Sequence, residues 1–352
     1  MKGLVLAGGK GSRLRPFTYS GAKQLVPIAN TPVLHFPVHQ LVDAGITDIG
    51  IVVGETGSQV RAAMGDGSDF GAAFTYIPQP APLGIAHAIL TARDFLGGHP
   101  FVLYLGDNVL LGGIERFVRA FDDSTAVASI ILKEVEDPRA FGVAEVRDGR
   151  LIRMVEKPEH PPTNLAVIGV YAFRPPVFDV IEGQEPSARG ELEISDTITR
   201  LVERGEAVIA SLTREHWIDT GKMEDILAAN RVVLESLGAG RRIAGSVTNC
   251  RFDGPVFVED GAALDSCSVV GPVTIARGAR LRNCRIGPHV AIGARAALEN
   301  VAIRNSIVME SAALSDCPGI EDSMVGRFAY VAGAPAGSRL TLGDHSRIEV
   351  SP

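Results

Sequence analysis

The chain has 352 residues, of which 46% are hydrophobic and 21% charged, so it can bury the core of about two domains and is not disordered as a whole. Its 34 Lys and Arg face 41 Asp and Glu, and the net charge of -7 argues against binding to nucleic acid or to an anionic membrane. No run resembles a membrane span, and the apolar start at residues 3–7 is too short for a signal peptide. We therefore expect a cytoplasmic protein with no membrane partner.

Residues 1–230 alternate apolar runs of strand length with amphipathic segments. The runs at residues 4–6, 49–53 and 101–105 are short and aliphatic, which is typical of buried parallel strands. Between them, residues 32–44 and 85–96 fit helices. This alternation predicts a mostly parallel sheet covered by helices, in which ligands bind at the carboxyl ends of the strands.

A glycine-rich segment follows the first predicted strand and carries the most specific signal in the chain. It reads LAGGKGSRLRP at residues 6–16, and KQLVP follows at residues 23–27. Glycines let the backbone approach a ligand closely, so consecutive N–H groups can point at phosphate oxygens. Arg13 and Lys23 add positive charge. The pattern is neither the dinucleotide-binding nor the Walker signature, but the two segments together indicate a phosphate-binding loop.

From Pro255 onward the chain can be written in blocks of seventeen residues. Apolar residues then form three columns, which are Val258, Ile275, Ile292 and Met309; Leu264, Leu281 and Leu298; and Val269, Ile286, Ile303 and Ile320. Three short strands per block predict the triangular coils of a parallel β-helix, with like side chains stacked inside. A glycine-rich loop region that repeats by chance is the weaker alternative.

The cysteines follow the same repeat. Cys250, Cys267 and Cys284 are seventeen residues apart, and Val301 takes their column in the next block. A thiol that a valine can replace behaves as a small buried hydrophobe, and no paired spacing of a zinc site or disulfide framework is present. Cys317 stands outside the column and carries no prediction.

The order of motifs resembles that of the sugar-1-phosphate nucleotidyltransferases, and most closely the long-form glucose-1-phosphate thymidylyltransferases. After the glycine loop come QPAPLGIAHA at 79–88, LGDN at 105–108, EKP at 156–158, GELEI at 190–194 and WIDTG at 217–221. The resemblance spans nearly the whole chain. It implies an α/β fold, with a Rossmann-like nucleotidyltransferase domain of mixed, mostly parallel sheet at residues 1–237. A left-handed parallel β-helix domain with a C-terminal tail would follow at residues 238–352.

The resemblance also implies a reaction, in which glucose 1-phosphate attacks the α-phosphorus of dTTP to give dTDP-glucose and pyrophosphate. Such an in-line displacement requires two anions to be brought together and charge to be neutralised as pyrophosphate departs. Mg²⁺ is the expected cofactor, because it prefers carboxylates, phosphates and water as ligands. By resemblance its protein ligands are Asp107 and Asp219, although Asp107 taken alone could equally cap a turn.

The remaining site residues are assigned by the same resemblance. Arg13 would hold and polarise the triphosphate, and Lys23 would act near the α-phosphate. The residues expected to bind the nucleotide are Leu6, Ala7, Gly8, Gly9, Gly11, Ser12, Gln24, Gln79 and Gly84. Those expected to bind the sugar phosphate are Asn108, Gly142, Glu156, Lys157 and Val167, while Arg189 and Glu191 belong either to the sugar site or to a loop. The Gln79 amide can pair with the imide edge of a pyrimidine, but thymine over uracil rests on the resemblance alone.

Other functions stay open at this point. The close alternative uses UTP or another NTP. A non-catalytic regulatory homologue would have lost charged motif residues, whereas all of them are present. Acyl transfer by the β-helix would need a general base, and neither His289 nor His345 lies in a recognised motif; His87 and His216 are also given no role. The flat sides and open ends of a β-helix favour a homo-oligomer.

Overall fold

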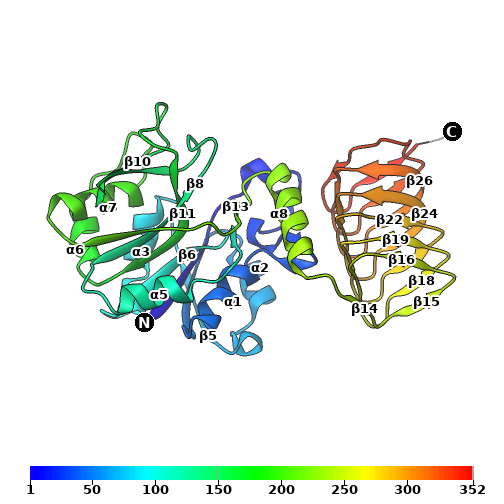
Figure 1. Cartoon of the computed structure of the whole chain (residues 1–352), viewed down its shortest axis with the longest axis horizontal. Coiled ribbons are helices and arrows are strands. Elements are labelled where there is room, and N and C mark those ends of the chain that lie inside the picture. Colours follow the sequence, from blue (N-terminus) through cyan, green and yellow to red (C-terminus); the bar gives the residue numbers. More distant parts are fainter. Residues whose placement is uncertain (149, 351–352) are drawn as a thin grey trace. The chain divides into compact units, whose positions relative to one another are not determined.

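The computed structural model describes residues 1–148 and 150–350, which divide into two compact units (Figure 1). The first unit consists of Met1–Lys10 and Leu34–Trp217, and the second of Gly11–Val33 and the chain from Ile218 onward. The glycine-rich segment is therefore split, because the chain from Gly11 to Val33 packs with the β-helix unit. The predicted boundary at residue 237, between a catalytic domain and a β-helix domain, stays a prediction.

The first unit is built on one mixed sheet. Its strands run in the order β10-β9-β11-β6-β1-β4-β5, and β8 pairs with both β11 and β12. The strands of the unit are β1 (Lys2–Ala7), β4 (Asp48–Val53), β5 (Ala73–Pro78), β6 (Phe101–Leu105), β7 (Asn108–Leu110), β8 (Ala128–Glu134), β9 (Gly142–Arg147), β10 (Arg150–Glu156), β11 (Leu165–Phe173) and β12 (Val208–Leu212). The helices are α1 (His35–Asp43), α2 (Gly57–Met64), α3 (Ile85–Thr91), α4 (Arg93–Leu96), α5 (Glu115–Asp122), α6 (Val177–Glu182) and α7 (Ile194–Glu203).

The three predicted strands lie side by side at the centre of this sheet. Strand β1 pairs in parallel with β4 on one side and β6 on the other, so Leu4 lies opposite both Gly50 and Leu103. Strand β11 runs antiparallel to β6, which makes the sheet mixed. The predicted helices also form, but the first begins only at His35 and the second is divided at Ala92, whose φ of -88° and ψ of 4° end α3.

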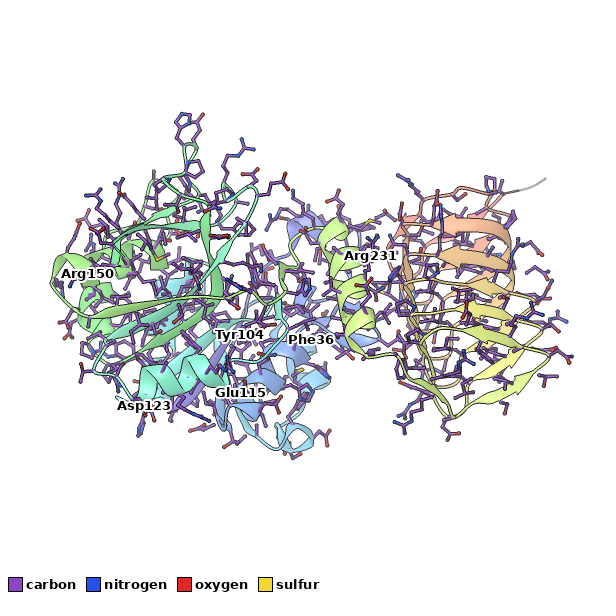
Figure 2. The ribbon with its side chains drawn as sticks, viewed as in Figure 1. Phe36, Tyr104, Glu115, Asp123, Arg150 and Arg231 are labelled. Carbon is purple, nitrogen blue, oxygen red and sulfur yellow. The ribbon has the colours of Figure 1, made fainter. Side chains whose placement is uncertain are left out.

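The core of the first unit is mainly aliphatic, as the composition indicates. Leu4, Leu103, Ile89 and Ile198 are all fully buried between the sheet and its helices. Tyr104 in β6 is also fully buried, and this burial raises the pKa of its phenol (Figure 2). Burying a leucine or isoleucine side chain contributes about 1.5–3 kcal/mol. These residues therefore stabilise the central strands, whose carboxyl ends lead into the predicted site residues.

His35 at the start of α1 makes the stability of this unit dependent on pH. Its ring lies edge-on to Phe70 with centroids 4.9 Å apart, and burial together with the charge of His39 lowers its pKa to about 4. The unfolded chain therefore binds more protons between pH 6.5 and pH 4, and stability falls as the pH drops through this window.

We expect His35→Gln to lessen this loss by about 1 kcal/mol, a value that allows for solvent screening of a partly exposed ring. Urea unfolding midpoints at pH 7.5 and pH 5 measure it. The exposed His160→Gln is the control, which should leave the pH dependence as in the wild type. An identical pH dependence in His35→Gln and His160→Gln would contradict the assignment.

The second unit combines a loop, one long helix and a β-helix. The loop contains 3₁₀ turns at Ser12–Leu14, Phe17–Tyr19 and Lys23–Leu25 and the short strands β2 (Pro27–Ile28) and β3 (Thr31–Pro32). Strand β13 (Trp217–Asp219) enters the unit, and helix α8 (Met223–Ser236) leads to the β-helix. The β-helix strands are β14 (Arg241–Ile243), β15 (Ser246–Thr248), β16 (Arg251–Asp253), β17 (Val256–Val258), β18 (Ala263–Asp265), β19 (Ser268–Val270), β20 (Val273–Ile275), β21 (Arg280–Arg282), β22 (Arg285–Ile286), β23 (Val290–Ile292), β24 (Ala297–Arg304), β25 (Ser306–Val308), β26 (Ala313–Glu321), β27 (Met324–Val325), β28 (Tyr330–Ala332), β29 (Thr341–Leu342) and β30 (Arg347–Glu349).

The β-helix confirms the predicted repeat. Its coils stack in parallel, with Leu264 opposite Leu281 and Leu281 opposite Leu298, and the coils follow one another in Figure 1 from yellow-green to red. The coil length and three strands per coil fit the left-handed form that the resemblance implied. The fold class is thus confirmed.

One detail of the predicted columns is wrong. Ile292 pairs with Val308 rather than with Met309, because this coil is one residue shorter than the others. For the same reason Val301 pairs with Cys317, so Cys317, for which the sequence carried no prediction, joins the column of buried thiols. Burial raises the pKa of the Cys317 thiol, which keeps it in the neutral form that stacks in an apolar core.

No helix in the described parts of the chain combines the length and the apolar character needed to cross a bilayer.

Candidate active site

The predicted site residues fall into two sets, one in each compact unit. The first unit carries Leu6, Ala7, Gly8, Gly9, Gln79, Gly84, Asp107, Asn108, Gly142, Glu156, Lys157 and Val167. The second carries Gly11, Ser12, Arg13, Lys23, Gln24 and Asp219.

The first cluster joins the end of β1 to the turn before α3. A Cβ on Gly8 would lie 3.5 Å from Oε1 of Gln79, so the two residues are in contact. The amide Nε2 of Gln79 donates to the Gly84 carbonyl at 3.4 Å and lies 2.9 Å from Nδ1 of His87. Gly84 has a φ of 102°, and a Cβ there would lie 2.5 Å from the Leu192 carbonyl oxygen, so only glycine fits. His87, which we gave no role, orients the predicted base-reading amide.

The second cluster follows β6, at the carboxyl end of the central strand. Nδ2 of Asn108 donates to Oδ1 of Asp107 at 2.9 Å. Oδ1 of Asn108 accepts from the Trp217 indole at 2.6 Å and from the Gly169 amide at 3.4 Å. Asn108 is only 2% exposed, and its side-chain amide orients Asp107 and holds the strand ends together. The contact of Asn108 with sugar phosphate that the sequence leads us to expect stays a prediction.

The third cluster centres on Glu156 at the end of β10. Oε1 of Glu156 lies 3.0 Å from the Lys157 ammonium and 3.5 Å from the Arg189 guanidinium, and Oε2 accepts from the Ser195 hydroxyl at 2.7 Å. Gly142 is opposite Glu156 in the sheet, and a Cβ there would lie 3.0 Å from the Ser195 hydroxyl. The motif EKP and the start of α7 therefore meet at one carboxylate.

A cavity of about 590 Å³ opens beside this carboxylate, lined by Glu156, Arg189, Glu193 and Asp196 among others. Burial, with the charge of Glu156 added, raises the pKa of Glu193, and burial also raises the pKa of Asp196. The Arg189 guanidinium lies 3.3 Å from the Glu193 carboxylate and also contacts Glu156, so it bridges Glu156 and Glu193. A pocket of carboxylates, hydroxyls and three guanidinium groups can hydrogen-bond a polyhydroxylated ligand.

In the second unit, the glycine turn packs directly on Lys23. Gly11 has a φ of 61°, and a Cβ there would lie 2.8 Å from the Cβ of Lys23 and 2.9 Å from Thr18. The Thr18 hydroxyl donates to the Gly11 carbonyl at 2.7 Å and closes the turn. Lys23 is 7% exposed and Gln24 2% exposed, and Oε1 of Gln24 is buried without a hydrogen-bond partner in the described chain. The two halves of the predicted phosphate-binding loop are thus in contact.

Arg13 and Asp219 come together at Gly221. A Cβ on Gly221 would lie 2.9 Å from Nη2 of Arg13 and 3.3 Å from Oδ2 of Asp219. Gly221 donates its backbone N–H to the Asp219 carbonyl at 2.8 Å, which forms the turn of the WIDTG motif. Burial raises the pKa of Asp225, against the opposing effects of the Lys222 backbone N–H and of the charges of Lys222 and Arg13. A side chain at position 221 would therefore crowd both the Arg13 guanidinium and the Asp219 carboxylate.

The comparison with known proteins decides the family. The family model for nucleotidyl transferases matches residues 2–236. The chain belongs to this family. The nucleotidyl transferase is 45% identical over 282 residues to a glucose-1-phosphate thymidylyltransferase from Streptomyces antibioticus, which covers 75% of this chain and 79% of the relative.

Further relatives agree with this assignment. The low-salt glycan biosynthesis nucleotidyltransferase Agl11 of Haloferax volcanii is 50% identical over 265 residues, covering 74% of each chain. Among solved structures, a Bacillus anthracis chain assigned as a glucose-1-phosphate thymidylyltransferase, in complex with sucrose, aligns with a TM-score of 0.63 and 37% identity, over 66% of this chain and 94% of its own. A UDP-glucose pyrophosphorylase with UDP-glucose has a TM-score of 0.60 and 25% identity, over 67% and 98% of the two chains. The resemblance to sugar-1-phosphate nucleotidyltransferases is confirmed.

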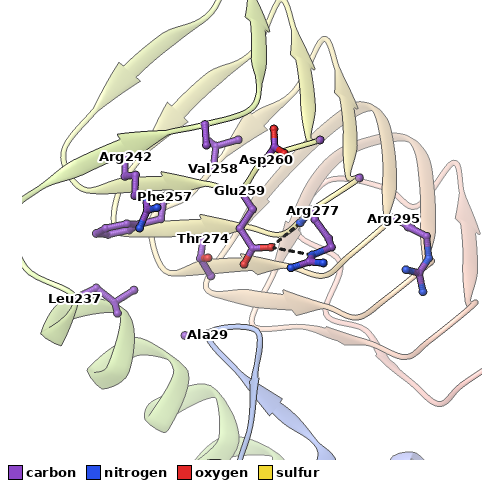
Figure 3. Close-up of a pocket in the computed structure, with 13 residues that line it drawn as sticks. Ala29, Leu237, Arg242, Phe257, Val258, Glu259, Asp260, Thr274, Arg277 and Arg295 are labelled. Atoms are coloured by element: carbon purple, nitrogen blue, oxygen red, sulfur yellow. Dashed lines mark hydrogen bonds and ion pairs between the residues drawn. The ribbon is translucent and has the colours of Figure 1, made fainter. Parts of the chain in front are cut away.

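Another cavity of the nucleotidyl transferase, of about 820 Å³, lies in the second unit and is not lined by any predicted site residue (Figure 3). Figure 3 shows Ala29 and Leu237 facing Phe257 and Arg277 of the β-helix. Arg277 is tied to Glu259 by its backbone N–H, which donates to Oε2 at 2.8 Å. The catalytic assignments therefore do not rest on this cavity.

Sequence reasoning missed several residues that shape the nucleotidyl transferase site. Glu193 lies within the GELEI motif and Ser195 directly follows it, at the start of α7, so this motif is the signal that could have found them. Trp217 orients Asn108 from 109 residues away, so only the fold reveals this contact, whereas His87 orients Gln79 from eight residues away within the same motif. No group of three or more His, Cys, Asp or Glu that could hold a metal ion occurs in the part of the chain that the structure describes.

Proposed function

We propose that the chain transfers the thymidylyl group of dTTP to glucose 1-phosphate, giving dTDP-glucose and pyrophosphate. The observation that carries the proposal is the glycine turn packed on the buried Lys23, a cationic loop suited to a triphosphate. The choice of dTTP and glucose is supported by relatives named glucose-1-phosphate thymidylyltransferase that are 45% and 48% identical to this chain.

The proposed reaction balances without a protein nucleophile. A phosphate oxygen of glucose 1-phosphate forms a bond to the α-phosphorus of dTTP, and the bond from that phosphorus to the bridging oxygen breaks. Pyrophosphate leaves with the electron pair. Arg13 would hold the departing phosphates, and Lys23 would neutralise charge that builds on the α-phosphate, which is the main task of the protein in such a displacement.

Asp107 and Asp219 would hold Mg²⁺. Two carboxylates fit this ion, because Mg²⁺ is commonly bound by one or two carboxylates, with substrate phosphates and water completing its shell. The hydrogen bond from Asn108 to Oδ1 of Asp107 supports this role, since it orients the carboxylate. When bound, the ion would supply charge neutralisation at the phosphates.

On the sugar side, Lys157 would bind the phosphate of glucose 1-phosphate, and Glu156 would accept hydrogen bonds from sugar hydroxyls. Lys157 has a φ of 42°, a left-handed backbone that residues with side chains adopt mainly at turns and functional sites. Its ammonium lies 3.0 Å from Glu156, so one short motif offers both a cation and an acceptor.

Lys157→Ala is expected to raise the KM for glucose 1-phosphate by about tenfold, the loss of one charged hydrogen bond, with kcat within about threefold of wild type. Initial rates at varied sugar phosphate and saturating dTTP measure this. Lys133→Ala, which removes a lysine bonded to the Glu215 carbonyl, is the control and should keep the wild-type KM. An unchanged KM in Lys157→Ala would remove Lys157 from the sugar site.

UTP is the second candidate nucleotide, favoured by the likeness to UDP-glucose pyrophosphorylase with UDP-glucose. The Gln79 amide offers a donor and an acceptor to either pyrimidine. A pyrophosphate-release panel of dTTP, UTP, ATP, CTP and GTP against several sugar 1-phosphates tests the proposal. The highest kcat/KM for dTTP with glucose 1-phosphate supports the proposal. If no pair of NTP and sugar 1-phosphate released pyrophosphate, a regulatory homologue would be favoured. The homo-oligomer inferred from the β-helix remains a further proposal.

A further inference from the structure

We propose that the β-helix positions the catalytic loop, and that Arg327 and Asp344 are positioning residues for the segment that carries Lys23. The inference rests on the proposed function, because it gives Lys23 a catalytic role. All the contacts that carry it lie within the second unit, and the hydrogen bonds among them that reach the β-helix join residues 11–33 to coils 262 to 324 residues later in the chain.

The first anchor lies directly beside the Lys23 turn. Nη2 of Arg327 donates to the Leu25 carbonyl at 3.0 Å, and Leu25 is the last residue of the 3₁₀ turn Lys23–Leu25. Arg327 lies in the β-helix turn between β27 and β28, and its side chain is 30% exposed, so this hydrogen bond is partly shielded from water. A guanidinium thereby fixes the backbone two residues from the catalytic ammonium.

Asp344 ties this anchor to the other side of the loop. Its carboxylate accepts from the Arg327 backbone N–H at 2.7 Å, pairs with the Arg327 guanidinium at 3.6 Å and accepts from the Ser20 hydroxyl at 2.8 Å. The side chain is 8% exposed, which strengthens each of these bonds. The neighbouring Gly343 touches Pro16, because a Cβ there would lie 3.2 Å from the Pro16 carbonyl oxygen. The loop is therefore held before and after Lys23.

A third anchor holds the hairpin that ends the loop. Nδ2 of Asn30 donates to the Ile292 carbonyl at 2.9 Å, and the Ala29 N–H donates to Oδ1 of Asn230 in α8 at 2.9 Å. Ala29 and Asn30 both have positive φ, 47° and 66°, as a two-residue hairpin turn requires. Alanine is disfavoured there, so contacts with the β-helix and α8 stabilise a turn that its own sequence disfavours.

These anchors matter because the loop has little regular structure of its own. It contains three single 3₁₀ turns and one pair of two-residue strands, which give few internal hydrogen bonds. Transition-state stabilisation by a cation depends on its position, and a displacement of about 1 Å can cost up to about 100-fold in rate. Loosening the loop should therefore lower kcat more than it changes the KM for the sugar phosphate, whose expected ligands lie in the first unit.

The test compares Arg327→Met with Arg304→Met, both in the full chain. Arg304 pairs with Glu321 on the next coil, so it matches Arg327 as an arginine–carboxylate pair between coils but is not among the residues that contact the loop. We expect Arg327→Met to lower kcat about tenfold, with an unchanged KM for glucose 1-phosphate. Arg304→Met should keep the wild-type kcat, and Arg327→Lys, which keeps a donor, should recover part of the loss. Ser20→Ala removes only one hydroxyl and should give a smaller fall in the same direction.

Hydrogen–deuterium exchange separates this inference from the proposed function. Amides of residues 11–33 should exchange faster in Arg327→Met than in Arg304→Met, while those of β1 and β6 stay the same. Equal exchange in the two variants, or faster exchange with a wild-type kcat, would overturn the inference while leaving the proposed function intact. A wild-type chain that releases no pyrophosphate with any substrate pair would instead remove the proposed function, and with it the catalytic meaning of the loop.

Discussion

Asp107→Asn is expected to lower the rate of pyrophosphate release by about 10³-fold while leaving the fold unchanged. Removing one carboxylate from the proposed Mg²⁺ site should cost several kcal/mol of transition-state stabilisation. Each 1.4 kcal/mol corresponds to about a factor of ten in rate. The fold should persist, because Asn108 donates to Oδ1 of Asp107 and an asparagine at 107 retains an oxygen in that place. Steady-state rates in Mg²⁺ buffer and a thermal unfolding curve measure the two effects.

The control for this variant is Asp123→Asn, which removes an exposed carboxylate at the end of α5 (Figure 2). It should keep the wild-type rate and unfolding temperature. A near-normal rate in Asp107→Asn would show that the carboxylate does not hold the ion. Loss of both rate and folded structure in Asp107→Asn would point to a structural cap instead.

Lys23→Met is expected to lower kcat by about 10²–10³-fold, the usual effect of removing one group that stabilises charge in the transition state. Methionine keeps the apolar stem that packs under Gly11, so the turn should survive and the unfolding temperature should stay near that of the wild type. Single-turnover measurements with excess enzyme separate the chemical step from binding.

Lys2→Met is the matched control for this variant. Lys2 is also partly buried, it donates to the Phe95 carbonyl at 2.6 Å, and it is not among the site residues. Its kcat should equal that of the wild type. If Lys23→Met turns over at the rate of Lys2→Met, the catalytic role of Lys23 is wrong.

The sequence predicted the elements whose pattern is periodic. Strands β1, β4 and β6 were found because aliphatic runs of strand length are common in buried parallel strands, and the columns of Leu264 and Val269 because coils repeat at a constant length. The shift to Val308, and with it the place of Cys317, was missed because a single-residue deletion preserves the apolar character of each strand.

Parts of the site could not be predicted because they depend on contacts between distant segments. Nothing near Lys23 in the sequence indicates that Arg327 holds the adjacent carbonyl, and the motif around Asn108 gives no sign that Trp217 occupies its amide oxygen. In contrast, Gly11 and Lys23 were expected together, because glycines followed by a cation have a local physical meaning. Functional residues that are close in sequence can be predicted from their chemistry, whereas the distant residues that position them are found only from the fold.

The central claim is that Asp107 and Asp219 act on one ion in one site. The most direct measurement is a crystal structure of the full chain with Mn²⁺ in place of Mg²⁺, glucose 1-phosphate and a non-hydrolysable dTTP analogue, with anomalous scattering recorded for manganese. The account predicts an anomalous peak coordinated by the carboxylates of both Asp107 and Asp219 and by a phosphate oxygen. A peak that contacts only one of these carboxylates, or neither, would contradict it.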